Sequence, residues 1–275
     1  MNDNNQKRKC ESLSQWVHRR LISGKSTFTL EEAMSATSLR RSSLALALHR
    51  LKVRKLIVSP MRGFYVCMPD RYQLRGDVPP VFYVDDLMRY LGRNYYLGLT
   101  SSAAIWGAGH QRIQGDYAVV TLPRMSSGGL ARGMLRFVYR KQMPEAHIVT
   151  RNADGGVVRF ADAALTAFDL VQHADLVGGM SSAATIVSEL IDEMDFTSLS
   201  DLGEVVPCVV WQRLGYICEE VVGASEKADA LYHTWRSLGL RIVNTPLSPF
   251  ERNRGGELNR RWHVKINLEI EVDDL

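Results

Sequence analysis

The side chains of this sequence best suited to chemistry are cations that gather between residues 40 and 62. Ten basic or hydroxyl side chains there are the candidates for contact with a ligand: Arg40, Arg41, Ser42, Ser43, His49, Arg50, Lys52, Arg54, Lys55 and Arg62. Guanidinium and ammonium groups neutralise phosphates, and arginine can also donate two hydrogen bonds to the edge of a guanine base. The pattern favours double-stranded DNA as the ligand. For any one of these residues, a solvated surface charge is the alternative.

The candidates divide by the contact that their positions favour. Four lie where a basic helix is expected to begin and are predicted to reach base edges and adjacent phosphates: Arg40, Arg41, Ser42 and Ser43. Five further cations are predicted to meet the phosphate backbone: Arg50, Lys52, Arg54, Lys55 and Arg62. His49 fits a DNA contact and an ordinary helix-surface histidine equally well.

Histidine and cysteine spacing does not predict a metal or redox site. Four histidines lie far apart in the chain: His110, His147, His173 and His233. Four cysteines are scattered without the close pairing of a zinc site, and we interpret them as reduced thiols: Cys10, Cys67, Cys208 and Cys218. No Gly-x-Ser-x-Gly, HExxH or P-loop pattern occurs.

Two glycine-rich stretches and one acidic stretch have simpler structural interpretations. SSGGLARG (126–133) and GGMSS (178–182) could cradle a phosphate, but they lack the lysine and the strand–loop–helix context of such loops. We interpret them as a hairpin loop and a helix cap. Asp192, Glu193 and Asp195 fit a solvated helix end better than an acid/base pair. The sequence therefore predicts no enzyme, no metal and no cofactor.

The elements around the basic residues follow the pattern of a winged helix-turn-helix. Apolar spacing predicts a first helix over about 12–23, and Thr29 with Glu32 forms the capping signature of a second helix. A third helix follows a turn at about 36–38, and its core-facing stripe is Leu44, Ala47, Leu48 and Leu51. Strands at 56–60 and 64–68, joined by a turn at 61–63, then predict a hairpin with Arg62 near its tip. A winged helix used only for protein contacts is the alternative function of this order.

Charge and linker composition predict two domains. Residues 1–80 hold 15 Lys and Arg against 6 Asp and Glu, a net charge of +9, whereas residues 81–275 hold 19 against 24, a net charge of −5. The segment 70–80 is rich in proline, glycine and charge, which is typical of a linker. We expect a DNA-binding domain over 1–76 and a second domain over 81–275.

The second domain is predicted to be α+β, which makes the whole chain α+β. Helices are expected over about 85–91, 101–107, 162–173, 181–193, 198–204, 207–222 and 224–238. Strands are expected over about 117–122, 135–140, 146–150, 156–159 and 262–271, with the 126–129 loop joining the first pair. The sequence contains no apolar run of about 18 residues and no secretory signal, so we expect a cytoplasmic protein without membrane contact.

Several short motifs, taken in order along the chain, resemble one family. They are MRGFYV (61–66), YYLGLTSSAAIWG (95–107), VVRFADAALTAFDLV (157–171), the following GG (178–179), RLGYICE (213–219) and WHVKINLEIE (262–271). In this order they resemble the AbiE-type antitoxins, the AbiEi family of bacterial abortive-infection systems. The resemblance covers nearly the whole chain and rests on the order of the motifs.

The resemblance implies a non-enzymatic protein with two roles in phage defence. The winged helix would bind double-stranded promoter DNA and repress the protein's own operon. The second domain would counter a cognate nucleotidyltransferase-like toxin, with or without a stable complex. Two other classes stay open: a stand-alone regulator whose second domain binds a small molecule, and a DNA-processing enzyme that uses the winged helix as a targeting arm.

Overall fold

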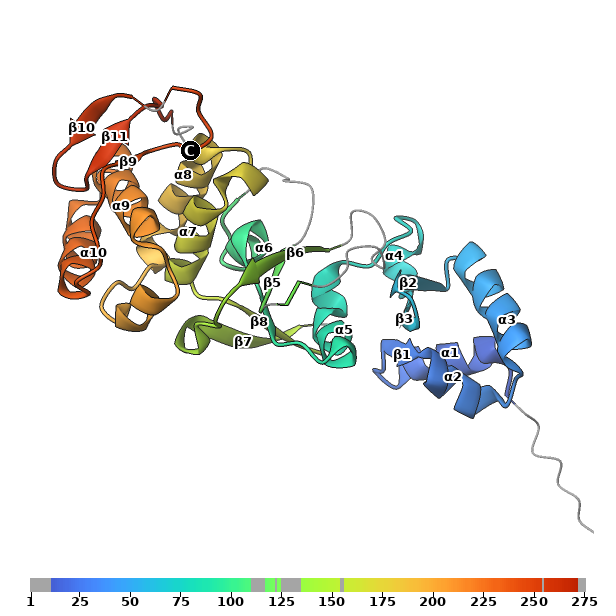
Figure 1. Ribbon diagram of the computed structural model, residues 1–275. Helices are drawn as coiled ribbons and strands as arrows, with labels where there is room; N and C mark the ends of the chain where they lie inside the picture. Colours follow the sequence, from blue (N-terminus) through green and yellow to red (C-terminus); the bar gives the residue numbers. More distant parts are fainter. Residues whose placement is uncertain are drawn as a thin grey trace, which may run out of the picture. The chain divides into compact units, whose positions relative to one another are not determined.

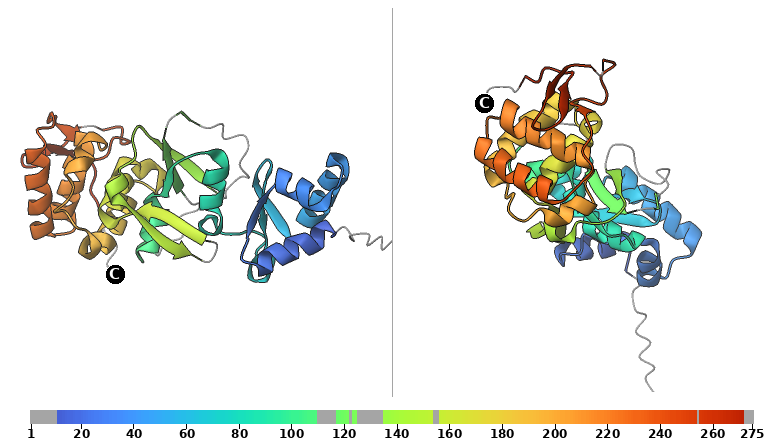
Figure 2. Two further views of the ribbon diagram at one scale, coloured as in Figure 1. Left: turned by 90° about the horizontal axis from the view of Figure 1, so that it is seen from below. Right: turned by 60° about the vertical axis from the view of Figure 1, so that its left-hand side comes forward.

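The protein forms two compact units. The computed structural model describes residues 11–109, 117–121, 123–124, 135–153, 156–253 and 255–271 (Figures 1 and 2). The first unit comprises Met1–Arg93, Met125–Leu135 and Arg151–Val158, and the second comprises Asn94–Arg124, Arg136–Thr150 and Arg159–Leu275. Helices and strands occur in both, so the predicted α+β class is confirmed.

The first unit extends beyond the boundary predicted between residues 76 and 81. The Thr27 hydroxyl donates a hydrogen bond of 2.6 Å to the Asp86 carboxylate. The rings of Phe64 and Tyr90 lie 5.5 Å apart. These contacts hold residues beyond 81 in the first unit.

The first unit contains a small antiparallel sheet and several helices. Its elements are α1 (Leu13–Ile22), β1 (Thr27–Thr29), α2 (Leu30–Thr37), α3 (Arg41–Val53), β2 (Ile57–Met61), β3 (Phe64–Cys67), α4 (Asp70–Gln73), a 3₁₀ helix (Pro80–Phe82) and α5 (Val84–Leu91). The three helices and the hairpin occur in the predicted order. The strand order is β1-β3-β2. β1 was missed because three residues are too short to show an alternating pattern, and α4 lies in the segment expected to be a linker.

Local sequence explains where these helices begin and end. Ser12 and Gln15 form a capping box at the start of α1. Thr29 and Glu32 form the predicted one at the start of α2, with the Thr29 N–H donating to the Glu32 carboxylate at 2.7 Å. Ser38 closes α2 in the left-handed conformation at φ 54°, and α3 begins three residues later.

The core of the first unit fixes the orientation of α3. Leu44, Leu48 and Leu51 are buried in a cluster that includes Trp16 and Phe28, whose rings meet edge to face at 5.1 Å. The predicted apolar stripe is thus confirmed. Because these leucines lie on one side of α3, the opposite side of the helix must face solvent.

A five-stranded sheet precedes a group of helices in the rest of the chain. The elements are β4 (Tyr95–Leu97), α6 (Leu99–Ile105), β5 (Tyr117–Thr121), β6 (Arg136–Arg140), β7 (Ile148–Ala153), β8 (Gly156–Ala161), α7 (Ala163–Gln172), α8 (Met180–Leu190), α9 (Cys208–Tyr216), α10 (Ser225–Ser237), β9 (Thr245–Pro246), β10 (Glu257–Asn259) and β11 (Val264–Ile266). Short 3₁₀ helices cover Glu145–His147, Ala174–Leu176, Ile191–Glu193 and Ser200–Glu204. The large sheet has the order β6-β5-β4-β8-β7, and β10-β11-β9 form a second, small sheet.

Several predicted elements of the second domain need correction. The helix expected over 207–222 is α9 followed by a π-helix, Ile217–Val221, and the helix expected over 198–204 is a 3₁₀ helix. The strand expected over 262–271 shortens to β11, because its partners β9 and β10 offer only a few residues for pairing. β4 was missed because all three of its residues are buried. The loop expected at 126–129 lies outside the described residues.

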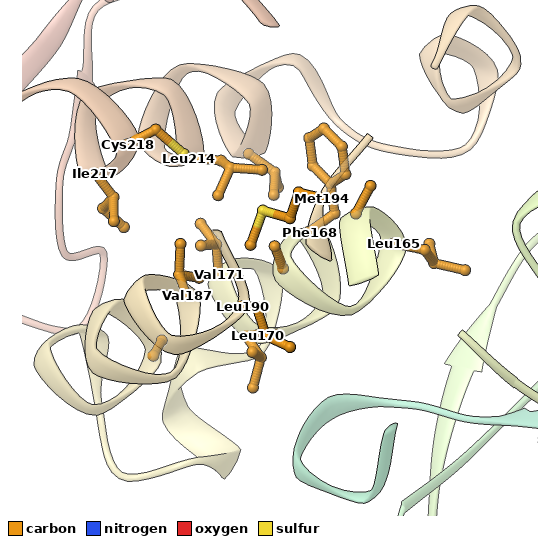
Figure 3. Close-up of a cluster of buried hydrophobic side chains, with 14 of the residues drawn as sticks. Leu165, Phe168, Leu170, Val171, Val187, Leu190, Met194, Leu214, Ile217 and Cys218 are labelled. Atoms are coloured by element: carbon orange, nitrogen blue, oxygen red, sulfur yellow. The ribbon is translucent and has the colours of Figure 1, made fainter. Parts of the chain in front are cut away.

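The core of the second unit lies among its helices. α7 is buried along almost its whole length and contacts α6, α8 and α9. Figure 3 shows side chains of α7, α8 and α9 gathered between these helices, Val171, Val187 and Leu214 among them. An extensive apolar core of this kind can stabilise the second unit on its own.

Candidate nucleic-acid interface

All ten candidate residues are exposed, and nine of them lie on or beside α3. Arg40 precedes the helix, and Arg41, Ser42, Ser43, His49, Arg50 and Lys52 belong to it. Arg54 and Lys55 follow the last helical residue. Arg62 lies on a separate element, the tip of the β2–β3 hairpin. Nine candidates therefore lie together on α3 or directly beside it, whereas Arg62 lies apart from them at the hairpin turn.

The segment around α3 is unbalanced in charge. Residues 33–69, between Glu32 and Asp70, contain seven arginine and lysine residues and no acidic residue. Because the buried side of α3 is occupied by leucines, these cations project into solvent. A cationic surface of this kind attracts a polyanion.

Four arginines elsewhere in the first unit form ion pairs with neighbouring carboxylates. Arg19 pairs with Glu11 at 2.6 Å, Arg20 with Glu32 at 3.5 Å and Arg75 with Asp77 at 2.8 Å. Arg89 contacts both Asp85 and Asp86. By contrast, within the described residues no ion pair involves a cation of the segment 33–69. These cations therefore keep their full capacity for an external anion.

Backbone geometry sets the two ends of this surface. Arg40 caps α3 without a side-chain hydrogen bond, so the first N–H groups of the helix point outward at its positive end. At the hairpin, Met61 pairs with Phe64, which leaves Arg62 and Gly63 as a two-residue turn with Gly63 at φ +83°. The turn presents the Arg62 side chain to solvent.

Two exposed apolar residues on α3 were not predicted from the sequence. The exposed fractions of Leu46 and Val53 are 52% and 68%. A helical wheel could have found them, because both fall outside the stripe that contains Leu44 and Leu48.

The second unit contains a buried polar cluster centred on Asp169 of α7. The exposed fractions of its carboxylate and of the Arg140 side chain are 1% and 5%, and the two form an ion pair. The Tyr96 hydroxyl donates to Asp169 at 2.9 Å. Burial and the negative charge of Asp169 raise the pKa of Tyr96 well above its ordinary value, so the phenol stays a donor. The cluster joins β4, β6 and α7.

A second cluster surrounds His147, which is buried. Its Nδ1 lies 2.6 Å from Asp162 and its Nε2 lies 2.9 Å from Asp201. Burial lowers the pKa of His147, but the hydrogen bonds and charges of the two carboxylates outweigh burial and raise it above its ordinary value. Imidazolium can donate to both carboxylates at once, so the arrangement ties the 3₁₀ helix at 145–147 to the start of α7 and to the 3₁₀ helix at 200–204.

Two of the cysteines, Cys67 and Cys218, are buried thiols. Cys67, Cys208 and Cys218 are free, and burial raises the pKa of Cys67 and of Cys218 to about 12. Among the described residues no three His, Cys, Asp or Glu side chains are placed to hold a metal ion. In the same part of the chain, no helix has the length and hydropathy needed to cross a membrane. His110 and Cys10 lie outside it.

Comparison with known proteins places this architecture in a class. Residues 96–220 match the family model of the AbiEi antitoxin C-terminal domain. The match begins in β4 and ends in the π-helix, so it contains the five-stranded sheet, the Asp169 cluster and α6 to α9. The protein is therefore of the antitoxin class of toxin–antitoxin systems. Within that class, residues 96–220 are similar to the AbiEi antitoxin C-terminal domain, which supports the resemblance that the motifs indicate.

A solved structure shares the fold beyond this domain. The crystal structure of the RV2827C protein from Mycobacterium tuberculosis aligns with a TM-score of 0.67 at 13% identity, and it covers 91% of this chain and 89% of that chain. At such low identity the similarity shows a common fold alone. No curated protein matches the chain.

Proposed function

We propose that the first unit is a winged helix-turn-helix that binds double-stranded DNA, with α3 as the recognition helix and the β2–β3 hairpin as the wing. The observation that carries this proposal is the acid-free segment 33–69, whose cations are exposed and form no ion pair within the described residues. A recognition helix in the major groove needs such a face, since its flanks lie against the phosphate backbone.

We further propose that the protein is an autorepressor and a non-enzymatic antitoxin. The first unit would act on promoter DNA of its own operon. The second unit, which contains the AbiEi domain, would counter a nucleotidyltransferase-like toxin in phage defence, in the cytoplasm. The charge break between the two parts of the chain supports this division, because residues 1–80 carry a net positive charge and residues 81–275 a net negative one.

A gel-shift competition tests the DNA-binding step. The variant carries Arg50→Ala, Lys52→Ala and Arg54→Ala, and the matched control carries Arg75→Ala with Arg89→Ala. The control removes cations of the same unit that are already neutralised by aspartates. We expect the α3 variant to lose affinity for all sequences, while the control binds as the wild type does. Equal loss in both variants would refute α3 as the DNA-binding surface.

A split phenotype tests the division of labour. Arg40→Ala with Arg41→Ala should abolish repression of a reporter driven by the native promoter and leave protection against the co-expressed toxin intact. Removal of residues 1–93, up to the start of the second unit, should give the same result if the second unit acts alone. Loss of protection in the arginine variant, with the chain still soluble and folded, would contradict independent activities.

A further inference from the structure

The outward side of α3 is a strip without arginine or lysine, in which polar and apolar side chains alternate. Successive residues of an α-helix turn by about 100°. Ser42, Leu46, His49 and Val53 therefore follow one line along the helix, opposite the buried leucines. All four are exposed, and Leu46 stands near the middle of the line.

Cations border this strip on both sides. By the same rotation, Arg41 and Lys52 lie along one edge of the strip, and Arg50 and Arg54 lie along the other. An exposed leucine between two cationic edges is a poor match for an apolar protein partner, which would leave these charges without counter-ions. It fits a groove whose floor is partly apolar and whose two walls are anionic.

The major groove of DNA has this chemistry. Its walls are phosphates, and among the base edges on its floor only thymine presents a methyl group. We propose that Leu46 contacts a thymine C5-methyl group and so determines part of the operator sequence. This inference rests on the proposed function of the first unit as a DNA-binding module. Ser42, one turn before Leu46, is placed for a hydrogen bond to a neighbouring base, and Arg41 lies at the phosphate edge.

The position of Leu46 within α3 supports this reading of the strip. Recognition helices contact bases mainly through their N-terminal residues, and Leu46 is the sixth residue of α3, whereas Val53 is the last. A contact between Leu46 and a second copy of this chain is the competing explanation for its exposure.

The test uses DNA selected by the protein itself. The full-length chain enriches a duplex from a random pool, and the enriched sequence is resynthesised with deoxyuridine in place of each thymidine in turn. Deoxyuridine pairs as thymidine does but lacks the C5-methyl group. Dissociation constants are measured for the wild type, for Leu46→Ala and for Ile22→Ala, a matched control with an exposed apolar side chain on α1 (74% exposed).

We expect one or two positions at which deoxyuridine weakens binding by the wild type and by Ile22→Ala about fourfold, the value of one buried methyl group. At those positions Leu46→Ala should bind both duplexes equally. The inference is overturned if no position responds, if Leu46→Ala responds as the wild type does, or if light scattering shows that Leu46→Ala dissociates a dimer. Failure to enrich any DNA would instead refute the proposed function.

Discussion

Replacing Asp169 by asparagine should destabilise the second unit strongly. Asparagine keeps the size of the side chain and removes its charge, so Arg140 loses its counter-ion at a site where the exposed fraction of its side chain is 5%. The Arg140 guanidinium also donates to the Val205 carbonyl at 3.3 Å, but a neutral acceptor does not replace the lost charge. Breaking one side of a buried ion pair typically costs about 3–5 kcal/mol of unfolding free energy. In a unit of this size, that loss lowers the Tm by about 6–20 °C.

A surface ion pair in the same unit provides the control. Glu145 and Arg159 form an ion pair of 2.7 Å, but the exposed fractions of their side chains are 57% and 26%. Glu145→Gln should therefore cost no more than about 1 kcal/mol. The ratio between the two variants tests burial as the cause, because both substitutions remove one carboxylate from one arginine.

Urea unfolding followed by tryptophan fluorescence measures both variants. Four of the five tryptophans, Trp106, Trp211, Trp235 and Trp262, lie in the second unit, so the signal reports mainly on it. Equal midpoints for Asp169→Asn and Glu145→Gln would refute the reasoning. So would an Arg140→Met/Asp169→Leu variant less stable than Asp169→Asn, since replacing both charges by apolar groups removes the unpaired cation.

Three further substitutions test other parts of the structure. Because the pKa of His147 is raised in the folded state, its contacts with the two carboxylates should stabilise the fold fully below pH about 6.5, and this contribution should be lost as the pH rises through the folded-state pKa. The difference in unfolding free energy between the wild type and His147→Gln, measured by urea titration from pH 5.5 to 8.5, should therefore shrink as the pH rises. A difference that grows with pH would contradict the raised pKa. Gly215→Ala would place a Cβ within 2.0–2.3 Å of the Trp262 ring, so it should lower stability by about 1–3 kcal/mol, and a midpoint equal to that of the wild type would mean that the ring moves freely. Leu48→Asp would bury a charge in the first core and should abolish cooperative unfolding of the first unit by circular dichroism; retention of a folded unit with only weaker DNA binding would show that α3 packs differently.

Local signals in the sequence were enough to predict most of the first unit. The capping pair Thr29 and Glu32 and the leucine stripe of α3 act over a few residues, so their structural consequences can be worked out without the fold. The same holds for the two-residue turn at Arg62 and Gly63. Element order along this unit follows from such short-range rules.

Features that depend on residues far apart in the chain could not be predicted. β4 is identified by its partners β5 and β8 and not by its own three residues. Asp169 stands in the largely apolar stretch AALTAFDLV (163–171), which hints at a buried carboxylate. Its partners Tyr96 and Arg140, however, lie 73 and 29 residues away. The exposure of Leu46 was accessible to sequence reasoning, since it follows from the helical rotation that identifies the stripe.

The salt dependence of DNA binding shows whether α3 meets the phosphate backbone. Fluorescence anisotropy of a labelled duplex from the region upstream of the gene, titrated with the full-length chain at several salt concentrations, gives the slope of log K against log salt. We expect a steep negative slope, about −0.9 for each phosphate neutralised and about −6 if all seven cations of the segment 33–69 take part. The slope should become shallower in the Arg50, Lys52 and Arg54 alanine variant. A slope near zero, or one unchanged by these substitutions, would contradict the claim that α3 meets the phosphate backbone.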